Sequence, residues 1–147
     1  TVIGSNVEPN YVLVERTTDR EPIIKTPKAN TVGYYPIEGS DKELLIVNIH
    51  GMNMAGDAAF NRHVDQCFEH IKNHDGPVIF AGDFNSKNDE RINHMVSGMH
   101  KHGLVPVHKF VEPSERIDQV FPRSQVKMIG ICQNNFWIVA VFLCLLR

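Results

Sequence analysis

The sequence has few cysteines, no excess of basic residues and no hydrophobic run long enough to cross a membrane. Its three cysteines, among 147 residues, are too few for a disulfide framework or a cysteine-rich zinc module. Fifteen Lys and Arg against 17 Asp and Glu give a formal charge of −2, which excludes a basic coat for nucleic acid over the whole chain. The apolar run at 136–146 is shorter than the ~20 residues of a membrane-spanning helix.

What is present fits one globular domain built from alternating strands and helices. The chain is 42% hydrophobic and 22% charged, and its length suits a single domain. Short apolar runs predict strands, and two stretches with apolar residues at helical spacing predict helices. The expected strands cover residues 11–16, 31–37, 44–50, 78–81 and 117–121, and the expected helices cover 57–74 and the stretch with Ile92, Met95, Val96 and Met99. This alternation predicts a layered α/β fold.

The second helix has recognisable end signals. Ser86 followed by Asp89 resembles a capping box at its start, and Gly103 is a natural residue to follow its last turn.

Polar side chains close the most apolar strand. Asn48 and His50 stand at the end of the run 44–50, two residues apart and therefore on one face of the strand. Polar groups at such a place are costly to bury without a purpose. Because ligands gather at strand ends in α/β folds, we expect these two residues to lie at a site.

The following strand ends in Gly82-Asp83-Phe84-Asn85. In an extended conformation Asp83 and Asn85 point the same way, while Phe84 points into the core. A carboxylate here can hold a water molecule near Mg²⁺, and an amide can donate to a phosphoryl oxygen. Gly82 allows close approach of the backbone. The combination suits attack of an activated water on phosphorus.

These motifs, in order, resemble the endonuclease/exonuclease/phosphatase (DNase I-like) superfamily. The set is Leu-Ile-Val-Asn-Ile-His, a helix, Gly-Pro-Val-Ile-Phe-Ala-Gly-Asp-Phe-Asn-Ser and then Arg-Ile-Asp-Gln-Val-Phe, within residues 26–121. Thr26-Pro27-Lys28 and Asn53 look like a poorly characterised bacterial branch. The resemblance implies a four-layer α/β/β/α sandwich and Mg²⁺- or Mn²⁺-dependent hydrolysis of a phosphodiester or phosphomonoester.

The resemblance also implies roles for individual residues. Asp83 activates or positions the attacking water and is a metal ligand. Asn85 and His50 contact the phosphate and belong to the catalytic set, and Asp118 orients a catalytic histidine further along the chain. Asn48 lies beside this set as a donor to the substrate.

The chain departs from the family pattern at both ends. The family has a metal-binding Glu in an early strand and a closing Ser-Asp-His, whereas no such Glu precedes Tyr11 and no His follows His108 here. We therefore expect a partial domain at 1–121, without its N-terminal strands and native C-terminal strand, and a divergent apolar tail at 122–147. The alternative is a non-catalytic, truncated or degenerate copy that acts as a binding module. Exposed sheet edges and apolar surface favour self-association.

Four metal-binding side chains share one side of the first expected helix. His63, Cys67, His70 and His74 are spaced four, three and four residues apart. One straight helix seldom supplies more than two converging zinc ligands, so we expect partly exposed histidines rather than a zinc site.

The sequence leaves the substrate open among DNA, RNA, phospholipids and small phosphoesters. The use of free cysteines favours a reducing compartment, hence the cytoplasm, without fixing it.

Overall fold

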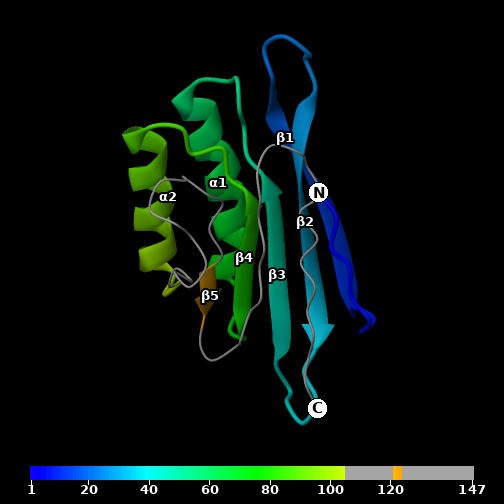
Figure 1. The fold of residues 1–147 in the computed structure, drawn as a ribbon. Helices are drawn as coiled ribbons and strands as arrows, with labels where there is room; N and C mark the ends of the chain where they lie inside the picture. Colours follow the sequence, from blue (N-terminus) through cyan, green and yellow to red (C-terminus); the bar gives the residue numbers. More distant parts are fainter. Residues whose placement is uncertain (105–120, 124–147) are drawn as a thin grey trace, which may run out of the picture.

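The computed structural model describes residues 1–104 and the strand at 121–123. In this part of the chain, five strands form one sheet in the order β1-β2-β3-β4-β5, and two helices cover one of its faces (Figure 1). Strands β3 and β4 pair in parallel, and the other neighbours pair antiparallel. The elements are β1 (Tyr11–Arg20), β2 (Pro27–Pro36), β3 (Glu43–His50), α1 (Asp57–Lys72), β4 (Val78–Asp83), α2 (Asp89–Lys101) and β5 (Phe121–Arg123).

The elements expected from the apolar pattern are confirmed within the described residues, with small shifts of their ends. The capping box expected at Ser86 is wrong. Asn88 is the N-cap of α2 instead, and its side chain accepts a hydrogen bond from the backbone N–H of Arg91 at 2.9 Å. Gly103, with a φ of +71°, closes the helix as expected.

Strand β3 is the centre of the sheet and is buried on both faces. Leu45, Val47 and Ile49 pack toward the helices. Leu44 and Ile46 pack on the opposite face, in a cluster with Tyr35, Ile79 and Ala81. A strand that is apolar on both faces is typical of a sheet covered on both sides.

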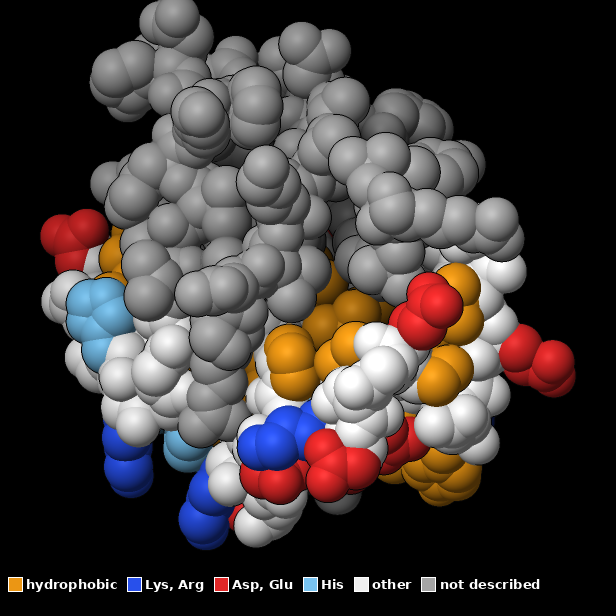
Figure 2. Space-filling view, turned by 90° about the horizontal axis from the view of Figure 1, so that it is seen from below, with side chains coloured by type: hydrophobic (Ala, Val, Ile, Leu, Met, Phe, Trp, Pro, Cys, Tyr) orange, Lys and Arg blue, Asp and Glu red, His pale blue; other side chains and the backbone are white. Residues whose placement is uncertain are grey.

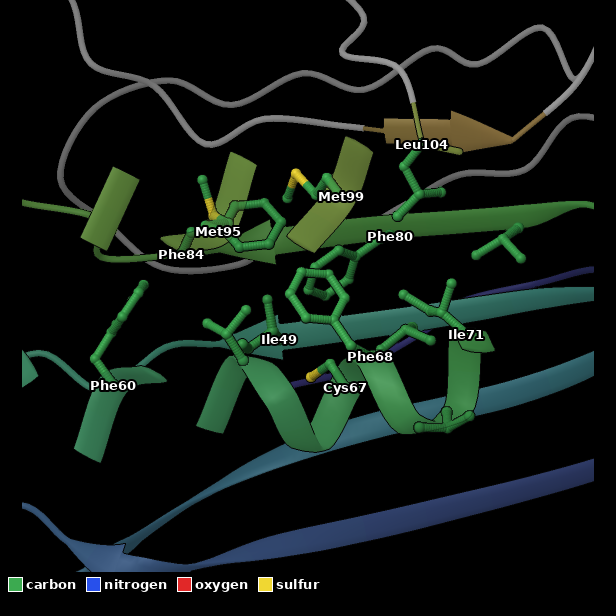
Figure 3. Close-up of a cluster of buried hydrophobic side chains, with 14 of the residues drawn as sticks. Ile49, Phe60, Cys67, Phe68, Ile71, Phe80, Phe84, Met95, Met99 and Leu104 are labelled. Atoms are coloured by element: carbon green, nitrogen blue, oxygen red, sulfur yellow. The ribbon is translucent and has the colours of Figure 1, made fainter. Parts of the chain in front are cut away.

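The larger core lies between the sheet and the helices. Figure 3 shows side chains of α1 and α2 meeting the rings of Phe80, within β4, and Phe84, just after it. Phe80 packs edge-on against Phe68 of α1 and against Phe84, with ring centroids 5.7 and 4.9 Å away. Met95 and Met99 are buried in the same cluster, as their helical spacing predicts. This core fixes the position of the β4 end, from which the candidate site is built.

The described residues form one sheet with helices on one face, which is half of the expected α/β/β/α sandwich. The mixed α/β fold is confirmed. Asp118, most of the strand expected at 117–121 and most of the tail at 122–147 lie outside the described residues. None of the described helices is long and apolar enough to cross a membrane.

Candidate functional site

Strands β3 and β4 end side by side, and their last residues face each other. In the parallel register His50 lies opposite Asp83, and the imidazole Nε2 is 3.7 Å from the carboxylate Oδ2. Side chains alternate along a strand, so Asn48 and His50 share the face of Leu44 and Ile46, away from the helices. The expectation that they lie on one face is confirmed. We call His50 and Asp83 the strand-end pair.

Gly82 allows the two strands to approach each other before this pair. Its φ is +138°, and a Cβ at this position would lie 1.9 Å from the backbone oxygen of Ile49. Phe84 follows the pair and is buried in the helix-side core, as expected. The backbone is therefore fixed on both sides of Asp83.

Asn85 does not continue the extended conformation that the sequence suggests. Its φ is +51°, in the left-handed region, and β4 ends two residues earlier at Asp83. Its backbone N–H donates to Oδ1 of Asp83 at 3.1 Å, and its side-chain amide donates to the backbone oxygen of Gly51 at 3.0 Å. Asn85 thus connects the loops that follow β3 and β4. The amide nitrogen expected to contact phosphate is used within the chain in this conformation.

Asn48 lies deeper than the strand-end pair. Its side-chain amide donates to the backbone oxygen of Val2 at 2.9 Å, and its side-chain oxygen is buried without a hydrogen-bond partner. The structure therefore gives Asn48 a contact with the N-terminal segment that the sequence does not predict.

Lys28 lies next to His50, and the pattern of strand-end residues did not single it out. The ammonium Nζ is 3.2 Å from Nε2 of His50 and 3.6 Å from Oε1 of Glu21. An ammonium group only donates, so Nε2 is the acceptor and a neutral imidazole carries its proton on Nδ1. The one feature of the sequence that included Lys28 was the Thr26-Pro27-Lys28 motif of the family resemblance.

His50 is held in its neutral form by its surroundings. Burial lowers its pKa, and the charge of Lys28 lowers it further. The carboxylate of Asp83 opposes this effect but does not outweigh it. A neutral imidazole near pH 7 can accept a proton or a hydrogen bond, which is what the chemistry expected here requires.

Glu21 is a buried carboxylate that organises the loop after β3. The residue is 1% exposed, and its oxygens accept hydrogen bonds from the backbone N–H groups of Asn53, Met54 and Ala55 at 2.8, 2.9 and 3.2 Å. Burial raises its pKa, but these hydrogen bonds and the charge of Lys28 outweigh burial, and the pKa lies below its ordinary value.

Arg91 holds the same loop from the other side. The residue is 4% exposed, and its guanidinium donates to the backbone oxygens of Met52, Asn53 and Ala55, and to that of Asn85 at 3.3 Å. The loop after β3 is therefore fixed by an anion from the β1–β2 hairpin and a cation from α2.

The helix histidines have other partners than a metal. His63 is 2% exposed and bonds to Asn30 at 2.8 Å, so the expectation of a partly exposed side chain is wrong for it. Burial lowers its pKa to about 4, with a contribution from the charge of Lys28. His70 is 3.0 Å from a carboxylate oxygen of Glu15, and Cys67 is buried in the core. Among the described residues, no three His, Cys, Asp or Glu side chains form a possible metal site.

Figure 2 shows the end of the molecule opposite the strand-end pair, where strand β4 begins. Acidic and basic side chains lie next to each other there, and the exposed pair Lys42–Asp75, at 3.6 Å, belongs to the loops of this end. The polar side chains aligned with the ends of β3 and β4 lie at the other end of the sheet.

Comparisons with known sequences give relatives without a stated activity. No family model matches the chain. A UPF0294 protein from Yersinia pseudotuberculosis is 35% identical over 112 residues, which are 72% of this chain and 43% of that protein. A UPF0294 protein from Vibrio vulnificus is 35% identical over 92 residues, which are 61% of this chain and 32% of that protein. The chain spans less than half the length of these curated relatives.

Comparisons with solved structures find phosphoesterase and nuclease-type enzymes. Sphingomyelinase C from Streptomyces griseocarneus has a TM-score of 0.59 at 18% identity, over 80% of this chain and 50% of that one. A mannosyl-6-phosphatase from Bacteroides thetaiotaomicron has a TM-score of 0.55 at 14% identity, over 86% of this chain and 60% of that one. An endonuclease/exonuclease/phosphatase family protein from the same species has a TM-score of 0.56 at 17% identity, over 79% of this chain and 50% of that one. At these identities the likeness concerns the fold, and the chain has the DNase I-like fold of the endonuclease/exonuclease/phosphatase proteins.

Proposed function

We propose that the protein hydrolyses phosphoesters, with the strand-end pair at the reacting phosphate. The observation that carries this proposal is the position of His50 and Asp83 at adjacent ends of parallel strands, 3.7 Å apart. Strand ends of this kind are where α/β folds bind ligands. The proposal is also supported by the neighbours in structure, several of which are enzymes that act on phosphoesters.

Each residue has a role that follows from its surroundings. In this proposal Asp83, whose side chain is 13% exposed, accepts a hydrogen bond from the attacking water. The neutral imidazole of His50 contacts a phosphoryl oxygen or moves a proton. The positive charge of Lys28 favours an anionic substrate beside it. Asn85 and Asn48 position the loops and the strand around this pair, and we keep contacts of both with the substrate as part of the proposal. Asp118 would orient a histidine, as the resemblance implies.

The described residues supply only part of a magnesium site. Asp83 is one carboxylate, and Mg²⁺ is commonly held by one or two carboxylates while it keeps several waters. A bound Mg²⁺ or Mn²⁺ would supply stabilisation of charge on the phosphoryl oxygens. Because the described residues bring no three metal-ligating side chains together, we derive no step through the metal.

The test is hydrolysis by the full chain of bis(p-nitrophenyl) phosphate and p-nitrophenyl phosphate, with Mg²⁺ and with EDTA. We expect metal-dependent hydrolysis that falls by about 100-fold or more in Asp83→Asn. Asp65→Asn is the matched control, because Asp65 also pairs with a histidine, His94 at 2.7 Å, but on the exposed flank of α1. Equal activity of Asp83→Asn and the wild type refutes the role of Asp83. A folded wild type without activity favours the non-catalytic binding module.

A further inference from the structure

The hairpin between β1 and β2 carries exposed hydrophobic side chains at its tip, which we define as residues 21–26. Ile23 is 76% exposed, more than any other large hydrophobic side chain among the exposed ones of residues 1–104, and its neighbour Ile24 is 57% exposed. Figure 1 shows that this hairpin tip extends beyond the ends of β3 and β4. Single exposed hydrophobic residues are common on proteins, but two in succession at the point of a projecting hairpin need an explanation.

The exposure follows from a well-bonded turn. The backbone N–H of Glu21 donates to the oxygen of Thr26 at 3.0 Å, and the N–H of Lys25 donates to the oxygen of Glu21 at 2.8 Å. The guanidinium of Arg20 donates to the oxygen of Lys25 at 3.0 Å. Glu21 turns its carboxylate inward to the loop after β3. The two isoleucines are thus held outward by the hydrogen bonds around them.

The charges near the hairpin tip are positive. Arg20 and Lys25 are exposed, while the carboxylate of Glu21 is buried beside Lys28. Asp19, the nearest other acid along the chain, is bonded to Arg62 at 2.8 Å. Isoleucines flanked by basic side chains match the interface of an anionic bilayer, where apolar groups enter the acyl boundary and cations meet the headgroups.

A third exposed hydrophobic side chain belongs to the loop that Glu21 binds. Met54 is 46% exposed, and its backbone N–H donates to Glu21 at 2.9 Å, so its loop is attached to the base of the tip. Lys28 bonds both to Glu21 and to His50. The apolar tip and the strand-end pair are therefore connected through one buried carboxylate and one lysine.

We propose that the hairpin tip docks on an anionic lipid bilayer, with Ile23 and Ile24 in the acyl boundary and Arg20 and Lys25 at the headgroups. A convex tip suits a bilayer better than a protein partner, because a specific protein interface takes about 800 Å² from each side. On the proposed function, which this step requires, the substrate class is then the phosphoester of a phospholipid headgroup.

The test is cosedimentation of the full chain with vesicles of phosphatidylcholine alone and of phosphatidylcholine mixed with phosphatidylglycerol. We expect binding to the anionic vesicles, a loss of about tenfold or more in Ile23→Ser/Ile24→Ser, and a smaller loss in Lys25→Gln. Val14→Ser is the control, because Val14 is 60% exposed on β1 but lies away from the tip. Circular dichroism establishes that each variant is folded.

Two results overturn the proposal: a wild type that does not bind anionic vesicles, and a double variant that binds like Val14→Ser. If the wild type instead self-associates through Ile23 and Ile24 without binding lipid, the tip is a protein contact and the proposal is wrong. The assay involves no hydrolysis, so it separates this proposal from the proposed function. Asp83→Asn should bind vesicles like the wild type, and an inactive wild type that binds them would contradict only the enzymatic role.

Discussion

Replacing Glu21 is expected to destabilise the fold more than the loss of one ordinary surface contact would. Its carboxylate is 1% exposed and accepts three backbone hydrogen bonds, and it lies 3.6 Å from Lys28. Hydrogen bonds to charged groups contribute about 1.5–3 kcal/mol each. Part of this is recovered when water enters the gap and the desolvation cost of the carboxylate disappears. We expect Glu21→Ala to lower the free energy of unfolding by about 3–5 kcal/mol.

The isosteric variant Glu21→Gln separates charge from shape. Its one side-chain oxygen can still accept from Met54 and Ala55, while its amide group meets the N–H of Asn53 as a second donor. We expect a loss of about 1–3 kcal/mol for this variant. Because the pKa of Glu21 is lowered in the folded state, the contribution of its charge is present above the ordinary pKa of 4.5 and is lost as the pH falls below it. Glu21→Gln should lack that part of the acid sensitivity.

The measurement is equilibrium unfolding in urea, followed by far-UV circular dichroism between pH 3 and pH 7, a range that covers the ordinary pKa of 4.5. Glu69→Ala is the control, since this side chain is 67% exposed and its pairing with Lys72 at 3.6 Å should matter by less than about 0.5 kcal/mol. A loss in Glu21→Ala no larger than in the control would show that the loop does not depend on this carboxylate.

Three further predictions concern the site and its support. Lys28→Met should raise the pKa of His50, because the lysine charge lowers it; proton NMR of the histidine ring measures this, and an unchanged pKa contradicts the contact. Gly82→Ala should cost about 3 kcal/mol or more in urea unfolding, since its Cβ would lie 1.9 Å from the oxygen of Ile49; a cost below about 1 kcal/mol is the contrary result. His63 binds a proton more readily in the unfolded than in the folded protein, so the free energy of unfolding should decrease by about 3 kcal/mol as the pH is lowered from 6.5 to about 4. His63→Gln should abolish this pH dependence in urea unfolding, and an equal dependence in both proteins refutes the prediction.

The helices and strands were predictable because the spacing of apolar residues within each segment indicates its secondary structure. The run 44–50 identifies β3 as a strand buried on both faces, and this is confirmed by its two hydrophobic clusters. The sequence placed His50 and Asp83 at the ends of two apolar strands, and the structure adds the parallel register that sets them opposite each other.

What the sequence did not predict depends on contacts between distant residues or on a single dihedral angle. Lys28 reaches His50 across 22 positions, and Glu21 binds a loop more than 30 positions away. The left-handed conformation of Asn85 breaks the two-residue period on which its expected direction rested. Burial of His63 depends on a partner in β2, Asn30, that helical spacing does not reveal.

The loop after β3 has a consequence for which changes of length the chain can accept. Surface loops ordinarily tolerate insertions and deletions. Here the N–H groups of Asn53, Met54 and Ala55 donate to one carboxylate, while the carbonyl oxygens of Met52, Asn53 and Ala55 accept from one guanidinium. One added or removed residue would shift these N–H and carbonyl groups away from the carboxylate and the guanidinium to which they are bonded. The segment between β3 and α1 is irregular in conformation, but we expect it not to tolerate a change of length.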